Sequence, residues 1–396
     1  MSEYFEKSIE LHRKTKGKWQ ISSKVPIDNK HDLSLAYTPG VAAVCEEIAK
    51  NKKQAYDLTM KSNSVAIISD GTAVLGLGDI GPEASLPVME GKAVLFKKFA
   101  DIDGVPIVIK TSSNDEIIRT VKAISPTFGG INLEDIKAPK CFEIEDALQD
   151  IGVPVFHDDQ HGTAIVLLAA LINASKVIDK PLAEMSVVIN GAGAAGVAIA
   201  KLLKCVGQSK DTCTPVRKIY VCDSKGIISS KRQNLYPYKQ KLLKFTNPDD
   251  KSGSVFDALQ HADVFIGVSV GNLLTGDNIR CMNKDPIIIA MANPIPEIMP
   301  DKAKAAGAAV VGTGRSDFPN QVNNVLAFPG VFRGALDAKA KRITSGMKIA
   351  AAYALADSVE HPNPEHILPN PLDKSVAPKI AEAVKNAAAR EGVSDL

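Results

Sequence analysis

Apolar and polar positions alternate in blocks along most of the chain, and these blocks predict its secondary structure. From residue 65 onward, short apolar runs are separated by longer segments whose apolar residues recur at helical spacing. The short runs predict strands at 65–69, 105–109, 128–133, 153–156, 185–190, 218–223, 263–268, 286–292 and 308–313. The longer segments predict helices at 82–100, 115–124 and 162–177, and alanine-rich helices at 345–360 and 375–392. Strands that alternate with helices are typical of βαβ units, so we predict an α/β protein with mostly parallel sheets.

The order of these elements predicts two domains and a helical C-terminus. A chain of 396 residues is long enough for two domains. The long apolar helix after the sequence HDDQHG leads into a strand that opens a nucleotide-binding unit. We therefore expect an N-terminal α/β substrate domain at 1–160 and a Rossmann-type NAD(P)-binding domain at 161–343. The C-terminal helices, at 344–396, are expected to return to the first domain.

Composition excludes several classes of protein. The chain is 45% hydrophobic and 23% charged, as in ordinary globular proteins, and its formal net charge of +2 argues against a dedicated nucleic-acid-binding protein. The charged start argues against a secretory signal, and the longest apolar stretch is interrupted by polar residues, so no membrane span is predicted. The six cysteines form no CxxC pair, so we expect reduced thiols in a cytoplasmic protein, with only Cys213 exposed.

A glycine-rich loop, in the sequence VVINGAGAAGVAIAKLL, joins a predicted strand to a predicted helix. The first glycine of a GxGxxG loop allows the tight turn, the second lets a pyrophosphate approach, and the third lets the helix pack on the strand. The N-terminus of the helix adds free N–H groups and a partial positive charge. The residues predicted to bind the dinucleotide here are Gly191, Gly193, Ala194, Ala195 and Gly196.

Asp223 ends the next predicted strand, where a Rossmann unit places the carboxylate that binds the ribose. This carboxylate would accept a hydrogen bond from the 2′-hydroxyl of NAD and would repel the 2′-phosphate of NADP. Lys225, Lys231 and Arg232 follow closely, however, and a cation there could offset Asp223 and bind the phosphate. The sequence therefore predicts a site for NAD or NADP, with NAD slightly favoured and dual use open.

Two acidic pairs follow two predicted strands of the first half. Glu134 and Asp135 follow the sequence GGINL, and Asp158 and Asp159 follow VPVFH. The carboxyl ends of strands line the ligand crevice in open α/β sheets, and four carboxylates there need a hard divalent cation such as Mg²⁺ or Mn²⁺. The alternative is that each pair caps a helix or lies in a solvated turn.

Four other residues near these segments have alternative interpretations. His157 and His161 have the spacing of half a zinc site, but no third nitrogen or sulfur ligand is near, so we interpret them as structural. Lys92 lies in a mainly apolar helical segment, where desolvation would make it a candidate base; a surface lysine whose stem covers apolar residues is the alternative. Tyr37 precedes a predicted helix start and is either a functional phenol or a packed tyrosine.

Taken together, these segments resemble the malic enzymes, in particular the small single-chain type of bacteria and archaea. The matching segments occur in the family's order and cover nearly the whole chain: LAYTPGVA, DGTAVLGLGDIGPEASLPVMEGKAVLFKKFADID, INLEDIKAP, FHDDQHGTA, INGAGAAG, MANPIPEI and NNVLAFPGVFRGALD. The resemblance implies metal-dependent oxidative decarboxylation of L-malate to pyruvate and CO₂ with NAD(P)⁺. It also implies a homodimer whose N-terminal segment reaches across the interface, with no nucleic-acid or membrane partner.

The resemblance further implies roles for individual residues. Lys92 matches the base that takes the proton of the malate 2-hydroxyl, Asp158 the acid that pairs with this lysine, and Tyr37 the acid that protonates the enol of pyruvate. The residues that match metal ligands are Glu134, Asp135 and Asp159. Those that match groups holding the substrate carboxylates are Asn293, which also faces the cofactor, and Asn324, with Asn323 beside them.

One position departs from the family. The larger, eukaryotic-type malic enzymes have an arginine that binds a substrate carboxylate where this chain has Ala73. We expect the carboxylate to be held instead by the Thr72 hydroxyl, nearby backbone N–H groups and Asn324. Two other functions remain open at this point: a related metal-dependent dehydrogenase for another 2-hydroxy diacid such as tartrate, and a catalytically inactive NAD(P) sensor.

Overall fold

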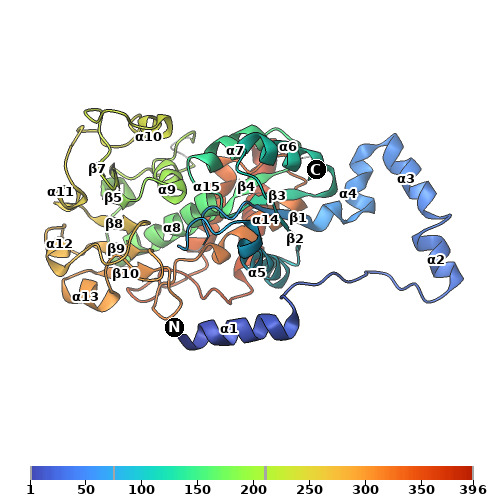
Figure 1. The fold of residues 1–396 in the computed structure, drawn as a ribbon. Coiled ribbons are helices and arrows are strands. Elements are labelled where there is room, and N and C mark those ends of the chain that lie inside the picture. Colours follow the sequence, from blue (N-terminus) through green and yellow to red (C-terminus); the bar gives the residue numbers. More distant parts are fainter. Residues whose placement is uncertain (1, 75, 209–211, 395–396) are drawn as a thin grey trace.

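The computed structural model describes residues 2–74, 76–208 and 212–394, and its helices surround two sheets (Figure 1). The first sheet has four parallel strands in the order β2-β1-β3-β4. Its strands are β1 (Ser64–Ser69), β2 (Asp103–Val108), β3 (Gly130–Leu133) and β4 (Val155–His157). Because β3 and β4 are neighbours and parallel, the acidic pairs that follow them lie at the same edge of the sheet.

The second sheet has six strands in the order β10-β9-β8-β5-β6-β7. Its strands are β5 (Ser186–Asn190), β6 (Lys218–Asp223), β7 (Gly226–Ile227), β8 (Val264–Gly267), β9 (Ile287–Ala290) and β10 (Val310–Thr313). All pairs are parallel except β6 with β7. The chain proceeds from β5 to one side and then returns to the other, which leaves a ligand crevice beside β5 as in Rossmann-type sheets.

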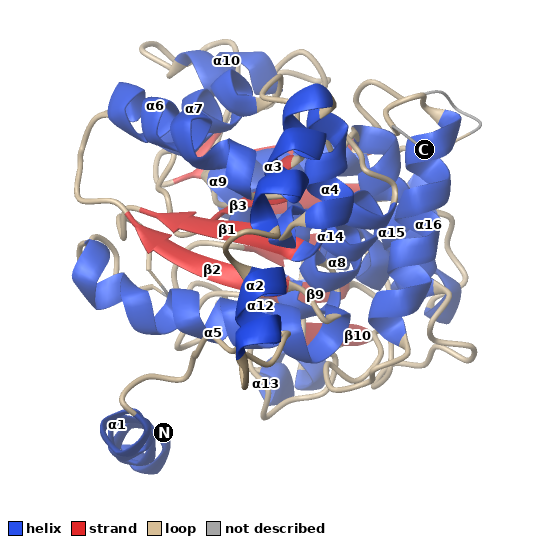
Figure 2. Ribbon diagram, turned by 90° about the vertical axis from the view of Figure 1, so that its right-hand side faces the viewer, coloured by secondary structure: helices blue, strands red, loops and turns tan. Residues whose placement is uncertain are grey.

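Helices cover both sheets and extend the chain at both ends (Figure 2). In the first part they are α1 (Ser2–Thr15), α2 (Lys30–Ala36), α3 (Val41–Lys50), α4 (Ala55–Leu58), α5 (Pro82–Ala100), α6 (Asn114–Ile124), α7 (Lys140–Leu148) and α8 (Asp158–Val177). They continue as α9 (Ala194–Leu203), α10 (Pro237–Leu242), α11 (Val255–Leu259), α12 (Gly276–Arg280), α13 (Pro300–Ala305), α14 (Phe328–Asp337), α15 (Ser345–Ala356) and α16 (Val376–Arg390). One-turn 3₁₀ helices are η1 (Lys52–Gln54), η2 (Met60–Asn63), η3 (Ser125–Thr127), η4 (Leu182–Glu184) and η5 (Asn324–Leu326).

The long helix α8 connects the two sheets and is buried over most of its length. One hydrophobic core includes residues of β1, α8 and β5, so the two halves of the chain share a continuous interior. At the C-terminus, α15 packs on α8, and α16 packs on α14, α15 and α5. Phe96 of α5 also meets the ring of Phe328 edge-on, with 4.7 Å between centroids. The predicted fold class, including the return of the C-terminal helices to the first domain, is confirmed.

The N-terminal segment projects from this body. Figure 1 shows α2 and α3 beyond the first sheet, and Figure 2, turned by 90°, shows them in front of it. Large apolar side chains along α1 and α2 and at the end of α2 are exposed: Tyr4, Phe5, Ile9, Leu11, Leu33, Leu35 and Tyr37. Such an accumulation of exposed apolar groups on a projecting segment is typical of a protein–protein contact.

Most predicted elements overlap elements of the structure, and several details differ. The strand β7 was not predicted, and α8 begins at Asp158 rather than at residue 162. The prediction for the cysteines is wrong at one pair: Cys213 is buried and forms a disulfide with Cys205. The chain after α9 returns to the end of that helix, where the Val216 N–H donates to the carbonyl oxygen of Leu203. None of the helices in the described ranges is long and apolar enough to cross a membrane.

Candidate active site

Three carboxylates meet at the carboxyl edge of the first sheet. Glu134 and Asp135 follow β3, and Asp159 lies in the first turn of α8, directly after β4. One oxygen atom from each of the three lies within 4.8 Å of the others. The backbone N–H of Asp135 donates to Asp159 Oδ2 at 2.8 Å, which fixes the two strand ends together. The structure thus brings together the three residues that the resemblance assigns to a metal.

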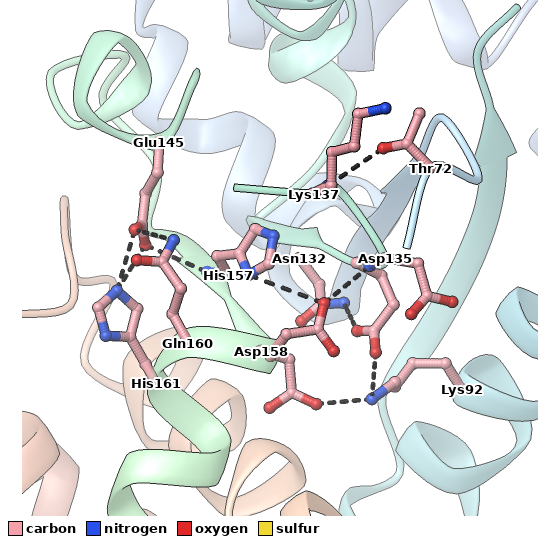
Figure 3. Close-up of polar contacts among 12 residues, drawn as sticks. Thr72, Lys92, Asn132, Asp135, Lys137, Glu145, His157, Asp158, Gln160 and His161 are labelled. Carbon is pink, nitrogen blue, oxygen red and sulfur yellow. Dashed lines mark hydrogen bonds and ion pairs between the residues drawn. The ribbon is translucent and has the colours of Figure 1, made fainter. Parts of the chain in front are cut away.

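Lys92 reaches this edge from α5 (Figure 3). Its Nζ lies 2.6 Å from Asp158 Oδ2 and 2.9 Å from Glu134 Oε1, and the side chain is only 7% exposed. The ring of Phe328 covers the ammonium at 4.2 Å from its centroid. Burial alone would favour the neutral amine, but the charges of Asp158 and Glu134 outweigh it and raise the pKa of Lys92.

The charges of this cluster do not balance without another cation. Four carboxylates face a single ammonium. Burial, together with the charges of Asp159 and Glu134, raises the pKa of Asp135 to about 9. Burial and the charge of Glu134 likewise raise the pKa of Asp158 to about 8. The buried Asp135 Oδ2 has no hydrogen-bond partner among the described residues. An unpaired oxygen within an acidic triad fits a hard divalent cation such as Mg²⁺ or Mn²⁺.

Asp158 and Asp159 are adjacent but face different partners. Asp158 is fully buried against Lys92, whereas Asp159 is a third exposed and lies in the triad. A Cβ at Gly162 would come within 1.8 Å of Asp158 Oδ1, so any larger residue at this position would displace the Asp158 carboxylate. The same Cβ would approach the side chain of Asn324 at 3.1 Å, which places η5 beside the lysine pair.

A buried glutamate that the sequence analysis missed supports the start of α8. Glu145 of α7 accepts hydrogen bonds from the His157 N–H at 3.1 Å, from Gln160 Nε2 at 3.0 Å and from His161 Nε2 at 2.9 Å (Figure 3). Burial lowers the pKa of His161 to about 4, so its imidazole is neutral at neutral pH and donates this bond. His161 therefore contacts a glutamate rather than the carboxylate triad.

The position of Glu145 had a signal in the sequence. It lies on the buried face of α7 with Cys141, Ile144 and Leu148, at the spacing of an apolar stripe. A carboxylate on such a stripe must find a partner inside the protein. The partners, however, come from a different element and could not be identified from spacing alone.

The dinucleotide loop has the geometry that its glycines predict. Gly191 has a φ of +126°, and a Cβ there would lie 2.6 Å from the Val268 carbonyl oxygen. A Cβ on Gly196 would lie 1.8 Å from the Gly191 carbonyl oxygen. Helix α9 begins at Ala194, followed by Ala195, and its N-cap residue, Gly193, offers no side-chain cap. The helix N–H groups are thus open to a pyrophosphate, and the cradle fits NAD or NADP.

Thr72 and its neighbours form a loop after β1 whose polar groups are already paired. The Thr72 hydroxyl donates to Asp70 Oδ1 at 2.7 Å and accepts from the Lys137 N–H at 3.1 Å. The N–H groups of Gly71, Thr72 and Ala73 donate to the Ser69 hydroxyl, the Asp70 carboxylate and the Asp135 carbonyl. These N–H groups therefore lie near the triad but already have acceptors.

The predicted asparagines lie on the second half of the chain. Asn293 is exposed in the loop after β9, and its carbonyl oxygen would lie 3.0 Å from a Cβ on Gly76 of the first half. Asn323 caps η5 by accepting the Val325 N–H at 3.0 Å, and Asn324 follows it beside α8. Both loops thus border the first half of the chain, and the Asn324 loop lies close to Asp158.

Tyr37 is the predicted residue that the structure does not bring to the others. It lies at the C-terminal end of α2 on the projecting segment, and its side chain is 66% exposed. Within the described part of the chain, its hydrogen bonds involve backbone atoms, with Leu33 and Val41. The carboxylates, Lys92 and the dinucleotide loop are instead assembled within one chain.

Comparisons with known proteins agree with this arrangement. A family model described as "Malic enzyme, N-terminal domain" matches residues 16–116 and 110–149, and one described as "Malic enzyme, NAD binding domain" matches residues 160–389. The bifunctional malic/malolactic enzyme of Bacillus subtilis is 56% identical over 98% of this chain and 94% of its own length. The NAD-dependent malic enzyme of Geobacillus stearothermophilus is 52% identical over 96% of this chain and 78% of its own.

A solved structure extends the likeness to the fold. The NAD-dependent malic enzyme of Thermotoga maritima is 48% identical to this chain and superposes with a TM-score of 0.91, covering 95% of this chain and 98% of its own. Sequence and fold therefore agree over nearly the full length, and the chain belongs to the malic enzyme family.

Proposed function

We propose that the chain catalyses the oxidative decarboxylation of L-malate to pyruvate and CO₂, with reduction of NAD⁺ or NADP⁺ and with Mg²⁺ or Mn²⁺ bound by Glu134, Asp135 and Asp159. The observation that carries the proposal is the position of Lys92, which is buried between Asp158 and a carboxylate of the triad. An acid–base group and a metal site that share a carboxylate suit a reaction that deprotonates a metal-bound hydroxyl. Residues 1–160 then supply the metal ligands and the base, and residues 161–343 bind the dinucleotide.

In this mechanism Lys92 takes the proton of the 2-hydroxyl as hydride leaves C2 for the nicotinamide. Asp158 holds the lysine in place through the 2.6 Å contact and stabilises the ammonium that forms. The charge of Glu134 contributes to the raised pKa of Lys92. If Glu134 also bound a metal ion, its charge would be shared, and it would hold the lysine proton less strongly. A bound divalent cation would acidify the hydroxyl and stabilise the enolate left by loss of CO₂.

The substrate carboxylates must be held mainly by side chains. The backbone N–H groups of residues 71–73 already have acceptors within the chain, so they offer little to a ligand. We assign this role to Asn293, Asn323 and Asn324, and to the Thr72 hydroxyl, which would have to leave its hydrogen bond to Asp70 Oδ1 to bind a ligand. Asn324 is the best supported of these, because its Cβ lies beside the turn that contains Asp158 and Gly162.

We propose that a second copy of the chain supplies Tyr37. The phenol is needed to protonate C3 of the enol, but in its own chain it is exposed on the projecting segment. The exposed apolar residues of α1 and α2 support a contact between copies that buries them. Light scattering coupled to gel filtration should give twice the mass of one chain. A monomer at the concentration of an active assay would contradict the proposal.

The proposed reaction is tested by following the reduced nicotinamide together with pyruvate and CO₂. We expect turnover of L-malate that requires Mn²⁺ or Mg²⁺ and is lost in Lys92→Ala, which should bind the dinucleotide nearly normally. A tartrate enzyme would show metal-dependent turnover of tartrate instead, and a sensor would bind the dinucleotide without turnover. Metal-independent or absent turnover of malate would contradict the proposal. A cytoplasmic location is part of the proposal, and cell fractionation tests it.

A further inference from the structure

Asp223, at the end of β6, is surrounded by cations rather than left open. Arg232 forms a two-pronged contact with it, from Nη1 to Oδ1 at 2.9 Å and from Nη2 to Oδ2 at 3.0 Å. Lys239 of α10 places its Nζ 2.6 Å from Oδ2, and the backbone N–H of Lys225 donates to Oδ1 at 2.9 Å. Two side chains and one backbone group thus converge on a single carboxylate.

This carboxylate lies where a Rossmann unit contacts the adenosine ribose. The Gly191 N–H donates to the carbonyl oxygen of Cys222 at 2.9 Å, so the residue after Cys222 stands next to the start of the phosphate loop. In other Rossmann units a free carboxylate at this position accepts a hydrogen bond from the 2′-hydroxyl of NAD. The contacts of Asp223 therefore bear on which dinucleotide the chain binds.

The acceptor capacity of Asp223 is filled. A carboxylate offers about four lone-pair positions, two on each oxygen. Oδ1 receives Arg232 Nη1 and the Lys225 N–H, and Oδ2 receives Arg232 Nη2 and Lys239 Nζ. A ribose 2′-hydroxyl would have to displace one of these donors, two of which are cationic, before it could bind here.

The charge at this corner favours an anion. One carboxylate between a guanidinium and an ammonium leaves a local net charge of +1. Burial alone would raise the pKa of Asp223, but the bonds from Arg232 and Lys239 lower it to about 2, so the carboxylate is ionised at neutral pH. The cations are 19% and 15% exposed, so water screens them only in part. Arg232 Nε has no acceptor among the described residues, and a guanidinium suits the geometry of a phosphate.

We propose that Arg232 and Lys239 bind the 2′-phosphate of NADP, with Asp223 as the residue that positions both cations, and that the chain therefore binds NADP⁺ in preference to NAD⁺. The proposal deepens the proposed function, on which it rests, by choosing between its two dinucleotides. It reverses the slight preference for NAD that Asp223 alone indicates, because the carboxylate is already neutralised by its own neighbours.

Two adenosine nucleotides that differ only in the 2′-phosphate test the proposal without malate, metal or turnover. Calorimetry should show adenosine 2′,5′-bisphosphate binding roughly 10- to 100-fold more tightly than 5′-AMP, the range expected when a phosphate gains one or two hydrogen bonds from charged groups. Arg232→Ala and Lys239→Met should each reduce this ratio by about 10-fold or more and leave the affinity for 5′-AMP nearly unchanged. The matched control is Lys231→Gln, because Lys231 is exposed and pairs with Asp250; its ratio should equal that of the wild type.

Other results would overturn the proposal. If the unaltered chain binds 5′-AMP as tightly as the bisphosphate, or the ratio is the same in Lys239→Met as in Lys231→Gln, the two cations do not form a 2′-phosphate site. Arg232 also donates to the carbonyl oxygens of Gly226 and Ile227. The binding ratio of Arg232→Ala is therefore interpreted only if this variant keeps the melting temperature of the wild type. If Arg232→Ala is destabilised, the binding ratio of Lys239→Met alone decides whether the cations form a 2′-phosphate site. Failure to turn over malate would leave the binding ratio intact, so the two proposals fail separately.

Discussion

If each active site takes Lys92 from one chain and Tyr37 from its partner, two inactive variants should restore activity when they are combined. Lys92 is buried between Asp158 and Glu134 in its own chain, whereas Tyr37 is 66% exposed on the projecting segment. Lys92→Ala and Tyr37→Phe should each lower the turnover of malate by roughly 10²- to 10⁴-fold, the usual contribution of a general acid or base. A dimer that contains one chain of each variant should nevertheless be active.

The size of the recovery follows from two-fold symmetry. A dimer that contains one copy of each variant has one site lacking both groups and one site that is fully intact. Purified through a different affinity tag on each chain, this mixed dimer should therefore have about half the turnover of the wild type. Two tagged wild-type chains, purified in the same way, provide the reference.

A site that takes Tyr37 from its own chain predicts a different turnover for the mixed dimer. If Tyr37 acted in its own chain, every site of the mixed dimer would lack one group, and the activity would stay at the level of the single variants. That result would refute the shared site. Lys92→Ala leaves two buried carboxylates unpaired, which can cost about 3–5 kcal/mol of stability. Lys92→Arg, which keeps the charge but does not deprotonate, should give the same complementation and excludes misfolding as the cause.

Three further predictions follow from the same region and from the disulfide. Asp159→Asn should weaken Mn²⁺ binding by at least about 100-fold, which is more than the loss of a residue that only contacts a metal ligand would cause. His161→Gln should change Mn²⁺ binding much less. Calorimetry with Mn²⁺ measures both affinities, and the reverse order would show that the ligand set is wrong. Glu145→Ala leaves three buried donors without an acceptor and should lower the free energy of urea unfolding by about 3 kcal/mol or more, with a near-zero change contradicting the assigned contacts. Because Cys205 and Cys213 form a disulfide, the chain unfolded without reductant should expose four reactive thiols, and six would contradict the pairing.

The strands could be predicted because parallel strands buried on both faces are continuous apolar runs. The start of α8 could not, because a pair of acids before an apolar segment is also typical of a loop. In the structure these acids form the first turn of the helix, where the partial positive charge of the N–H groups stabilises them. Local polarity alone does not distinguish a loop from a charged helix start.

That the two acidic pairs lie at one edge of the sheet could be predicted, since the ends of parallel strands meet there, but the choice of three of the four carboxylates as a triad was implied only by the family resemblance. The contacts of Glu145 and Lys239 could not be predicted in this way. Each comes from a helix outside the motifs, and each meets its partner only after distant segments pack together. For Asp223 this difference changes the interpretation, because its sequence position indicates NAD whereas its contacts favour NADP.

The adjacent aspartates Asp158 and Asp159 explain how the base and the metal site depend on each other. Two like charges about 4 Å apart repel by about 4 kcal/mol at an effective dielectric constant of 20, so each needs its own cation. Asp158 contacts Lys92, and Asp159 lies in the triad that we propose binds a metal. Lys92 also contacts Glu134, a member of the same triad. Against the effect of burial, the charges of Asp158 and Glu134 raise the pKa of Lys92 and so favour its ammonium form. In the proposed mechanism, ligation of Glu134 to a metal would weaken its hold on the lysine proton, so Lys92 would accept the hydroxyl proton more readily once the metal site is filled.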